Sequence, residues 1–318
     1  AQTEAGGFYR HGSDTVTILL YSVDELRDNL PLRERIVYAH EFTHALQDQH
    51  FGLSRVITAN AMNADETRGV IGLIEGDATF TMQEYALAAA QHDPAALDIL
   101  ELDLLGFGEY GPDIPEIFRE NTYLTYLDGM NFVKALYAEG GYAAINAAYR
   151  NPPRSSEQIL HPERYFSGDR PQRVYVDDPR AALAGSGWEF VDVDTLGEFY
   201  VRQILATQLD PATVDVAAEG WGGDQYFVYS NALRQQQAFL ARIAWDTPED
   251  SAEFAAAYRQ VAALRSGTSA QQIDGTTTCW TGADEALCLM VNVEASGDVM
   301  ISLAPTLDEA VAMFATQS

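Results

Sequence analysis

The sequence has almost no lysine and few basic residues of any kind. Lys134 is the only lysine, and 19 basic residues stand against 47 acidic ones, which gives a formal net charge of -28. Binding to phosphate backbones requires a basic surface, and an anionic membrane surface would repel such a chain. The composition therefore argues against nucleic acid as a partner and favours an acidic, solubilising surface.

Long hydrophobic runs are also missing. No stretch approaches the ~18–20 consecutive apolar residues that are needed to cross a bilayer, so we expect no membrane span. The sequence opens at Ala1 with a small and polar segment, as expected after removal of an export leader. This opening favours a secreted or extracytoplasmic location.

Cysteine is equally scarce. Cys279 and Cys288 are the only two, and they flank a turn signal between short apolar runs. Paired across a hairpin they would form one disulfide, which favours an oxidising compartment, and two buried free thiols are the alternative.

The remaining pattern predicts an α+β protein in two regions. Residues 1–180 should form a mainly helical domain with a small strand element near the N-terminus, and 181–318 an α+β region of unknown role. Turn-forming residues around Asn151-Pro152-Pro153 and again from Asp177 to Gly187 mark a candidate linker. The helices are expected at 31–51, 65–90, 115–140, 142–150, 194–209, 231–245 and 248–265, and the strands at 15–20, 277–281, 286–293 and 298–303.

The strongest functional signal is the segment His40-Glu41-Phe42-Thr43-His44, which lies inside a helical pattern. Its two imidazoles are one helical turn apart on one face, so they can share a Zn²⁺ ion. Glu41 then lies beside the metal, where a carboxylate can take a proton from zinc-bound water and pass it to a leaving amine. These residues predict a zinc-dependent hydrolase of peptide bonds.

A catalytic zinc site usually has a third protein ligand, for which the sequence offers two candidates. His50 has the histidine spacing of metzincins, but Gln47 stands where that class has a turn-forming glycine. Without the turn, six helical residues rotate His50 by about 240° from His44. Glu75 lies on the next expected helix among apolar residues, where an unpaired carboxylate is costly, and it is the preferred ligand.

The segment 36–150 resembles the gluzincin metallopeptidases. Glu75-Gly76-x-Ala78 is similar to the Asn-Glu-Gly-x-Ala motif of the aminopeptidase N-like members, and Tyr126-Leu127-Asp128-Gly129 is similar to their Tyr-x-Lys-Gly segment. The resemblance implies that a glutamate on a second helix completes the zinc site and that Tyr126 donates a hydrogen bond to the oxyanion. The Gly-x-Met-Glu-Asn segment of those aminopeptidases is missing, so the resemblance extends only to gluzincins in general.

A further catalytic candidate is His161, since several gluzincins use a later histidine to stabilise the oxyanion. The alternative is a loop histidine held by Glu163 or by a backbone carbonyl group. The expected activity is thus that of a zinc peptidase acting on a peptide or protein, with His40, His44 and Glu75 as ligands and Glu41, Tyr126 and His161 as catalytic residues. The alternative is a non-catalytic, zinc-stabilised secreted binding protein.

Overall fold

The computed structural model describes residues 6–12, 15–20, 29–106, 114–293 and 297–317. The opening residues 1–5 lie outside these ranges. Residues 22–28, where the helical sequence pattern that leads into 31–51 begins, lie outside them as well. The chain divides into two compact units, one of residues 1–62 and 66–169 and the other of residues 63–65 and 170–318. The second unit begins earlier than residue 181, the start that we expected from the turn-forming residues.

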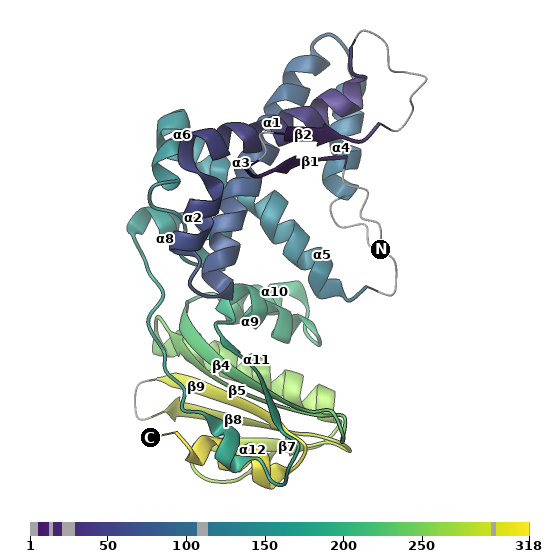
Figure 1. Cartoon of the computed structure of the whole chain (residues 1–318). Coiled ribbons are helices and arrows are strands. Elements are labelled where there is room, and N and C mark those ends of the chain that lie inside the picture. Colours follow the sequence, from purple (N-terminus) through teal and green to yellow (C-terminus); the bar gives the residue numbers. More distant parts are fainter. Residues whose placement is uncertain (1–5, 13–14, 21–28, 107–113, 294–296, 318) are drawn as a thin grey trace. The chain divides into compact units, whose positions relative to one another are not determined.

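The first unit is mainly helical (Figure 1). Two short antiparallel strands, β1 (Gly7–Arg10) and β2 (Thr15–Ile18), lie against α1. The helices that follow are α1 (Leu32–Phe51), α2 (Leu53–Asn60), α3 (Ala64–Ala90), α4 (Ala95–Gly106), α5 (Glu116–Tyr123), α6 (Gly129–Ala148), α7 (Ser156–Leu160) and α8 (Pro162–Ser167). A small apolar core joins α1, α3 and α4 through Ile36, Met82, Ala86, Ala96 and Leu100.

Helix α1 begins and ends where its sequence predicts. Pro31 precedes its first residue, and Gly52 follows its last with φ of 68°, a left-handed conformation that glycine adopts without steric cost. Between these ends the helix continues through Gln47 without a turn, so His40, His44 and Gln47 lie along one side of it.

Helices α3 and α6 touch through glycine. A Cβ atom at Gly76 would collide with the carbonyl group of Gly129, and a Cβ atom at Gly129 would collide with the carbonyl oxygen of Gly72. These glycines let the two backbones approach directly, which fixes the position of the neighbouring Glu75 relative to the start of α6.

A π-helical turn, η2 (Leu124–Asp128), joins α5 to α6. The sequence predicted one helix from 115 to 140 and did not indicate this turn, which contains Tyr126. The predicted break after Gly140 is confirmed, because Gly140 and Gly141 leave the helical conformation and Gly141 has φ of 61°. π-Helical turns are frequent at functional sites.

The second unit is a seven-stranded antiparallel sheet in the order β3-β4-β5-β9-β8-β7-β6, with helices on both faces (Figure 1). One face packs on α9 (Gly197–Ala206), α10 (Pro211–Ala218) and α11 (Pro248–Ser266), and the other on α12 (Leu307–Ala315) and the 3-10 turn η3 (Pro179–Ala182). The strands are β3 (Glu189–Asp194), β4 (Trp221–Asn231), β5 (Gln236–Trp245), β6 (Gln271–Gln272), β7 (Thr277–Thr281), β8 (Ala286–Val293) and β9 (Asp298–Ala304).

Mixed helix and sheet is therefore the observed fold class, but one expected helix is wrong. The segment 231–245 is rich in Ala, Leu, Arg and Gln, which favour helices, yet it forms the end of β4 and all of β5. Strand β5 pairs with β4 on one side and β9 on the other. Alternate residues of it, such as Leu240 and Ala241, enter the cores on opposite faces, and this burial overrides the local preference.

Cys279 and Cys288 are directly opposite each other on β7 and β8 and form a disulfide, as predicted. Both are fully buried. Such a bond is typical of proteins in oxidising compartments. Within the described residues, no helix combines the length and the hydrophobicity that a membrane crossing requires.

Candidate metal centre

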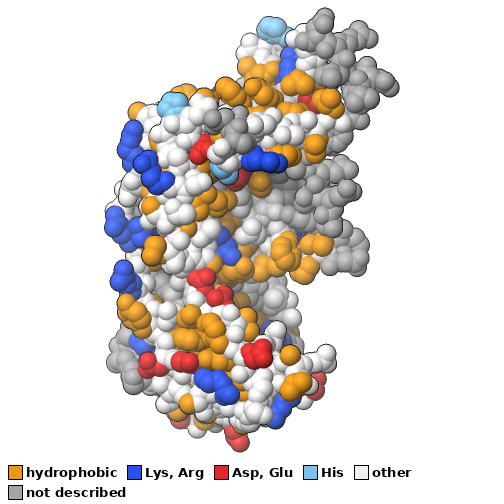
Figure 2. Space-filling view, viewed as in Figure 1, with side chains coloured by type: hydrophobic (Ala, Val, Ile, Leu, Met, Phe, Trp, Pro, Cys, Tyr) orange, Lys and Arg blue, Asp and Glu red, His pale blue; other side chains and the backbone are white. Residues whose placement is uncertain are grey.

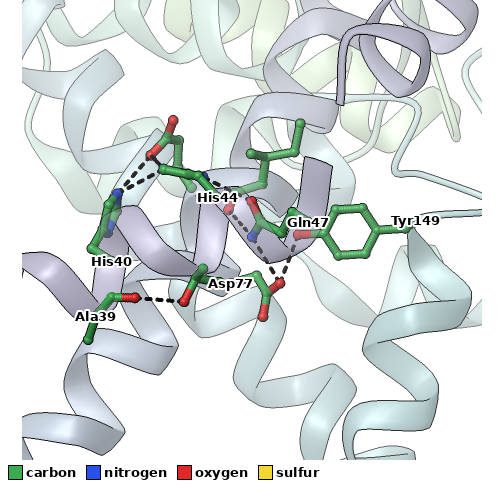
Figure 3. A network of polar contacts seen from close by, with 9 residues as sticks. Ala39, His40, His44, Gln47, Asp77 and Tyr149 are labelled. Carbon is green, nitrogen blue, oxygen red and sulfur yellow. Dashed lines mark hydrogen bonds and ion pairs between the residues drawn. The ribbon is translucent and has the colours of Figure 1, made fainter. Parts of the chain in front are cut away.

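Three side chains converge between α1 and α3 in the first unit (Figure 3). His40 Nε2 and His44 Nε2 each lie 3.2 Å from Glu75 Oε2, and the two Nε2 atoms lie 3.1 Å from each other. The three atoms thus form a nearly equilateral triangle. Helical spacing in α1 supplies the two imidazoles, and the close approach of α3 to α6 helps to hold Glu75 opposite them.

This triangle fits a tetrahedral zinc ion. An ion about 2.0–2.1 Å from each ligand holds the ligands roughly 3.3–3.4 Å apart in a regular tetrahedron, close to the distances here. Two imidazoles and one carboxylate are also ligands that zinc prefers. The side chains of His40 and His44 are about one-tenth exposed.

Within this triangle, His44 and Glu75 stabilise each other's charged forms. Burial lowers the pKa of His44, but the hydrogen bond and charge of Glu75, assisted by Gln47, raise it to about 9. Burial raises the pKa of Glu75, but hydrogen bonds from both histidines lower it well below its usual value. A bound metal ion would take the place of the proton on His44, so metal binding should release a proton.

Glu41 lies on the same helix with 8% of its surface exposed. Burial raises the pKa of its carboxyl group, although His40 and His44 lower it, and the backbone of Tyr9 in β1 donates a hydrogen bond to it. The carboxylate therefore lies beside the triangle of His40, His44 and Glu75 with an enhanced affinity for a proton, which suits a general base.

Tyr126 also lies at this site. Its ring centroid is 6.1 Å from that of His40, and the π-helical turn η2 places it there. His161 lies at the junction of α7 and α8, and its Nδ1 atom is 3.8 Å from Glu163. Helix α7 packs against η2. The catalytic role of His161 stays a prediction.

His50 lies away from the triangle. It is exposed near the end of α1, and its Nδ1 is 2.9 Å from the carbonyl oxygen of Leu46. The uninterrupted helix through Gln47 explains this position, as the geometry predicted. Glu75, and not His50, is the residue that lies with His40 and His44.

Sequence reasoning missed a second layer of polar groups behind His44. Its Nδ1 atom is 2.9 Å from Gln47 Oε1, and Gln47 Nε2 is 3.0 Å from both the Ile74 carbonyl oxygen and Asp77 Oδ2 (Figure 3). The Tyr149 hydroxyl donates to the same Asp77 oxygen at 2.8 Å. The signal in the sequence was Gln47 itself, a polar residue one turn after His44, together with Asp77 two residues after Glu75.

Comparison with known families and proteins locates similarity in the second unit. Residues 188–313 match the model of a domain of unknown function (DUF8575). No curated protein and no solved structure matches the chain. The matched segment does not include the triangle of His40, His44 and Glu75, which belongs to the first unit.

Proposed function

We propose that this chain is a zinc-dependent peptidase. The observation that carries the proposal is the triangle of His40, His44 and Glu75 ligand atoms, 3.1–3.2 Å apart, with the buried acid Glu41 on the same helix. The two histidines and Glu75 would hold the metal. When bound, zinc supplies a Lewis acid that polarises a carbonyl group and lowers the pKa of water.

The residues around the triangle have complementary tasks in peptide hydrolysis. Glu41 accepts the proton of the attacking water, because burial raises the proton affinity of its carboxylate, and returns it to the leaving amine. Tyr126 donates its phenolic hydrogen to the oxyanion that develops on the scissile carbonyl group. Its position beside the His40 ring supports this role.

An open coordination position distinguishes an enzyme from a zinc-stabilised binding protein. Structural zinc sites are usually closed by four Cys or His ligands. Among the residues that the structure describes, the group at this site consists of two histidines and one carboxylate. The cysteines are joined to each other in the second unit. Three ligands and an adjacent acid favour catalysis over the binding-protein alternative.

Zinc analysis combined with a peptide library tests the proposal. The purified protein should hold about one zinc ion per chain and cleave members of a quenched-fluorescent peptide library. A chelator should abolish the cleavage, and added zinc should restore it, which excludes contaminating proteases of other classes. A full zinc complement without cleavage of any peptide would favour the binding-protein alternative instead.

A further inference from the structure

The side chain of Gln47 has only one orientation that satisfies its neighbours. The Ile74 carbonyl oxygen and the Asp77 carboxylate can only accept hydrogen bonds, so the NH₂ group of Gln47 must face them. Its carbonyl oxygen consequently faces His44. Gln47 as a whole is only 3% exposed, which leaves little solvent to satisfy the opposite arrangement.

This orientation fixes the ring of His44. Because Gln47 Oε1 can only accept, the His44 Nδ1 atom must carry a hydrogen and donate it. In the neutral ring, Nε2 then has a free lone pair, and this is the atom that points to Glu75 and His40. A histidine that binds a metal through Nε2 requires this tautomer.

The other histidine has no comparable support. His40 Nδ1 is buried and has no hydrogen-bond partner among the described residues. The protein therefore orients one of the two imidazoles by hydrogen bonding through its second nitrogen. Tyr149 completes the arrangement, since its hydroxyl donates to the same Asp77 oxygen that accepts from Gln47.

We propose that Gln47 is a positioning residue that holds His44 in its metal-binding tautomer, and that Asp77 and Tyr149 hold the amide of Gln47 in the required orientation. The inference rests on the proposed metal site and adds to it the group that orients a ligand. It also explains why a glutamine stands at a position where metzincins have glycine. The side chain reaches back one turn to His44, and α1 continues to Phe51.

The test measures zinc affinity by competition with a chromogenic chelator. Gln47→Met keeps the length of the side chain but removes both hydrogen-bonding groups, and it should weaken zinc binding by about 10–100-fold. Gln49→Met, the same change at an exposed position of α1, should leave the affinity unchanged. In ¹⁵N-labelled, zinc-loaded protein, the Nδ1 proton of His44 should exchange slowly in the wild type and rapidly in Gln47→Met.

Variants of Asp77 distinguish positioning from a general loss of packing. Asp77→Asn can present an oxygen to both Gln47 and Tyr149, so its zinc affinity should stay close to that of the wild type. Asp77→Leu removes this acceptor and should weaken binding by about tenfold. If Gln47→Met does not fold, Tyr149→Phe is the substitute variant, because it removes the hydrogen bond to Asp77 and leaves Gln47 in place. Its zinc binding should be weaker by up to about fivefold.

Two results would overturn the inference. Zinc affinity and Nδ1 proton exchange that are unchanged in Gln47→Met would show that Gln47 does not position His44, while the metal site itself would stand. A wild-type protein that binds no zinc would contradict both the inference and the proposed function. The two failures are therefore distinguishable.

Discussion

At the scale of single residues, Glu75 and His50 differ in their position relative to His40 and His44. Glu75 Oε2 lies 3.2 Å from both imidazole nitrogens, whereas His50 is exposed and bonded to the carbonyl oxygen of Leu46. Loss of Glu75 would leave only the two histidines as candidate ligands, without the carboxylate that balances their charge.

We therefore expect Glu75→Ala to lose zinc and His50→Ala to keep it. Removing a ligand should weaken binding by more than the ~10–100-fold that is typical of supporting residues. Metal analysis after dialysis against a weak chelator measures the difference. Full zinc retention in Glu75→Ala together with loss in His50→Ala would reverse the choice of third ligand.

Tyr126 should affect the rate of hydrolysis without affecting the metal. Tyr126→Phe removes one donor to the oxyanion, which should lower kcat by on the order of 10²–10³-fold while zinc content stays at the wild-type level. Tyr123→Phe is the matched control, three residues earlier in the same chain segment, and should be neutral. A Tyr126→Phe variant with wild-type kcat would remove this residue from the mechanism.

At the scale of helices and strands, the sequence predicted elements with strong local signals. Helix α1 with its Pro31 start and Gly52 end, and strands β7 and β8 with their cysteines, were confirmed within a residue or two. Strand β5 was predicted as a helix, because strand β9, with which it pairs, and helix α12, which covers one of its faces, lie far from it in the chain. The π-helical turn η2 was also missed.

The candidate site also combines features that a local sequence pattern predicts with contacts that it does not. The helical spacing of His40 and His44 is local, so the sequence could predict it. Gln47 and Asp77, which contact each other, are 30 residues apart in the sequence, and Asp77 and Tyr149 are 72 residues apart. No local sequence pattern encodes these contacts. They depend on how α1, α3 and α6 pack together.

The contact between α3 and α6 yields a prediction for helix packing. Gly76→Ala gains about 1 kcal/mol of helix propensity, but its methyl group meets the Gly129 backbone, which cannot move aside without separating the helices. We expect a net loss of roughly 1–3 kcal/mol in the free energy of unfolding, with weaker zinc binding because Glu75 moves.

Urea denaturation and chelator competition measure the two effects. Gly275→Ala is the control, since a Cβ atom there has no neighbour within 4 Å, and it should change stability by less than about 0.5 kcal/mol. A Gly76→Ala variant with wild-type stability and zinc affinity would show that the close approach of these helices is not required.

At the scale of the whole molecule, the acidic surface and the two units are the dominant features. On the face in Figure 2, described side chains of both charge signs lie among apolar and uncharged ones. Each unit has its own hydrophobic core. The candidate metal site belongs to the first unit and the disulfide to the second.

Chelator and reductant should therefore destabilise different units. All four tryptophans, Trp188, Trp221, Trp245 and Trp280, lie in the second unit, so tryptophan fluorescence reports its unfolding. Reductant should lower the melting temperature measured by tryptophan fluorescence, since a disulfide contributes about 2–4 kcal/mol to the free energy of unfolding. Free zinc at 1,000 times its Kd should raise the free energy of unfolding of the first unit by about 4 kcal/mol. Removal of zinc should therefore lower the melting temperature measured by circular dichroism.

An effect of the chelator on the second unit would contradict this prediction. A chelator that shifts the tryptophan transition as much as the circular dichroism transition would mean that the metal stabilises the second unit as well. Mass spectrometry without reductant supplies the control, because the intact disulfide makes the chain two hydrogens lighter than the reduced form.

The central claim is that Glu41 performs general-base catalysis beside a zinc ion held by His40, His44 and Glu75. Its most direct test is the rate of peptide hydrolysis by Glu41→Gln, compared with the wild type at equal zinc content. Gln keeps the shape of the side chain but cannot accept the proton of the attacking water, so the rate should fall by at least about 10²–10⁴-fold. Glu101→Gln, an exposed position of α4, should retain wild-type activity. If Glu41→Gln binds zinc and cleaves as fast as the wild type, the proposed mechanism is wrong.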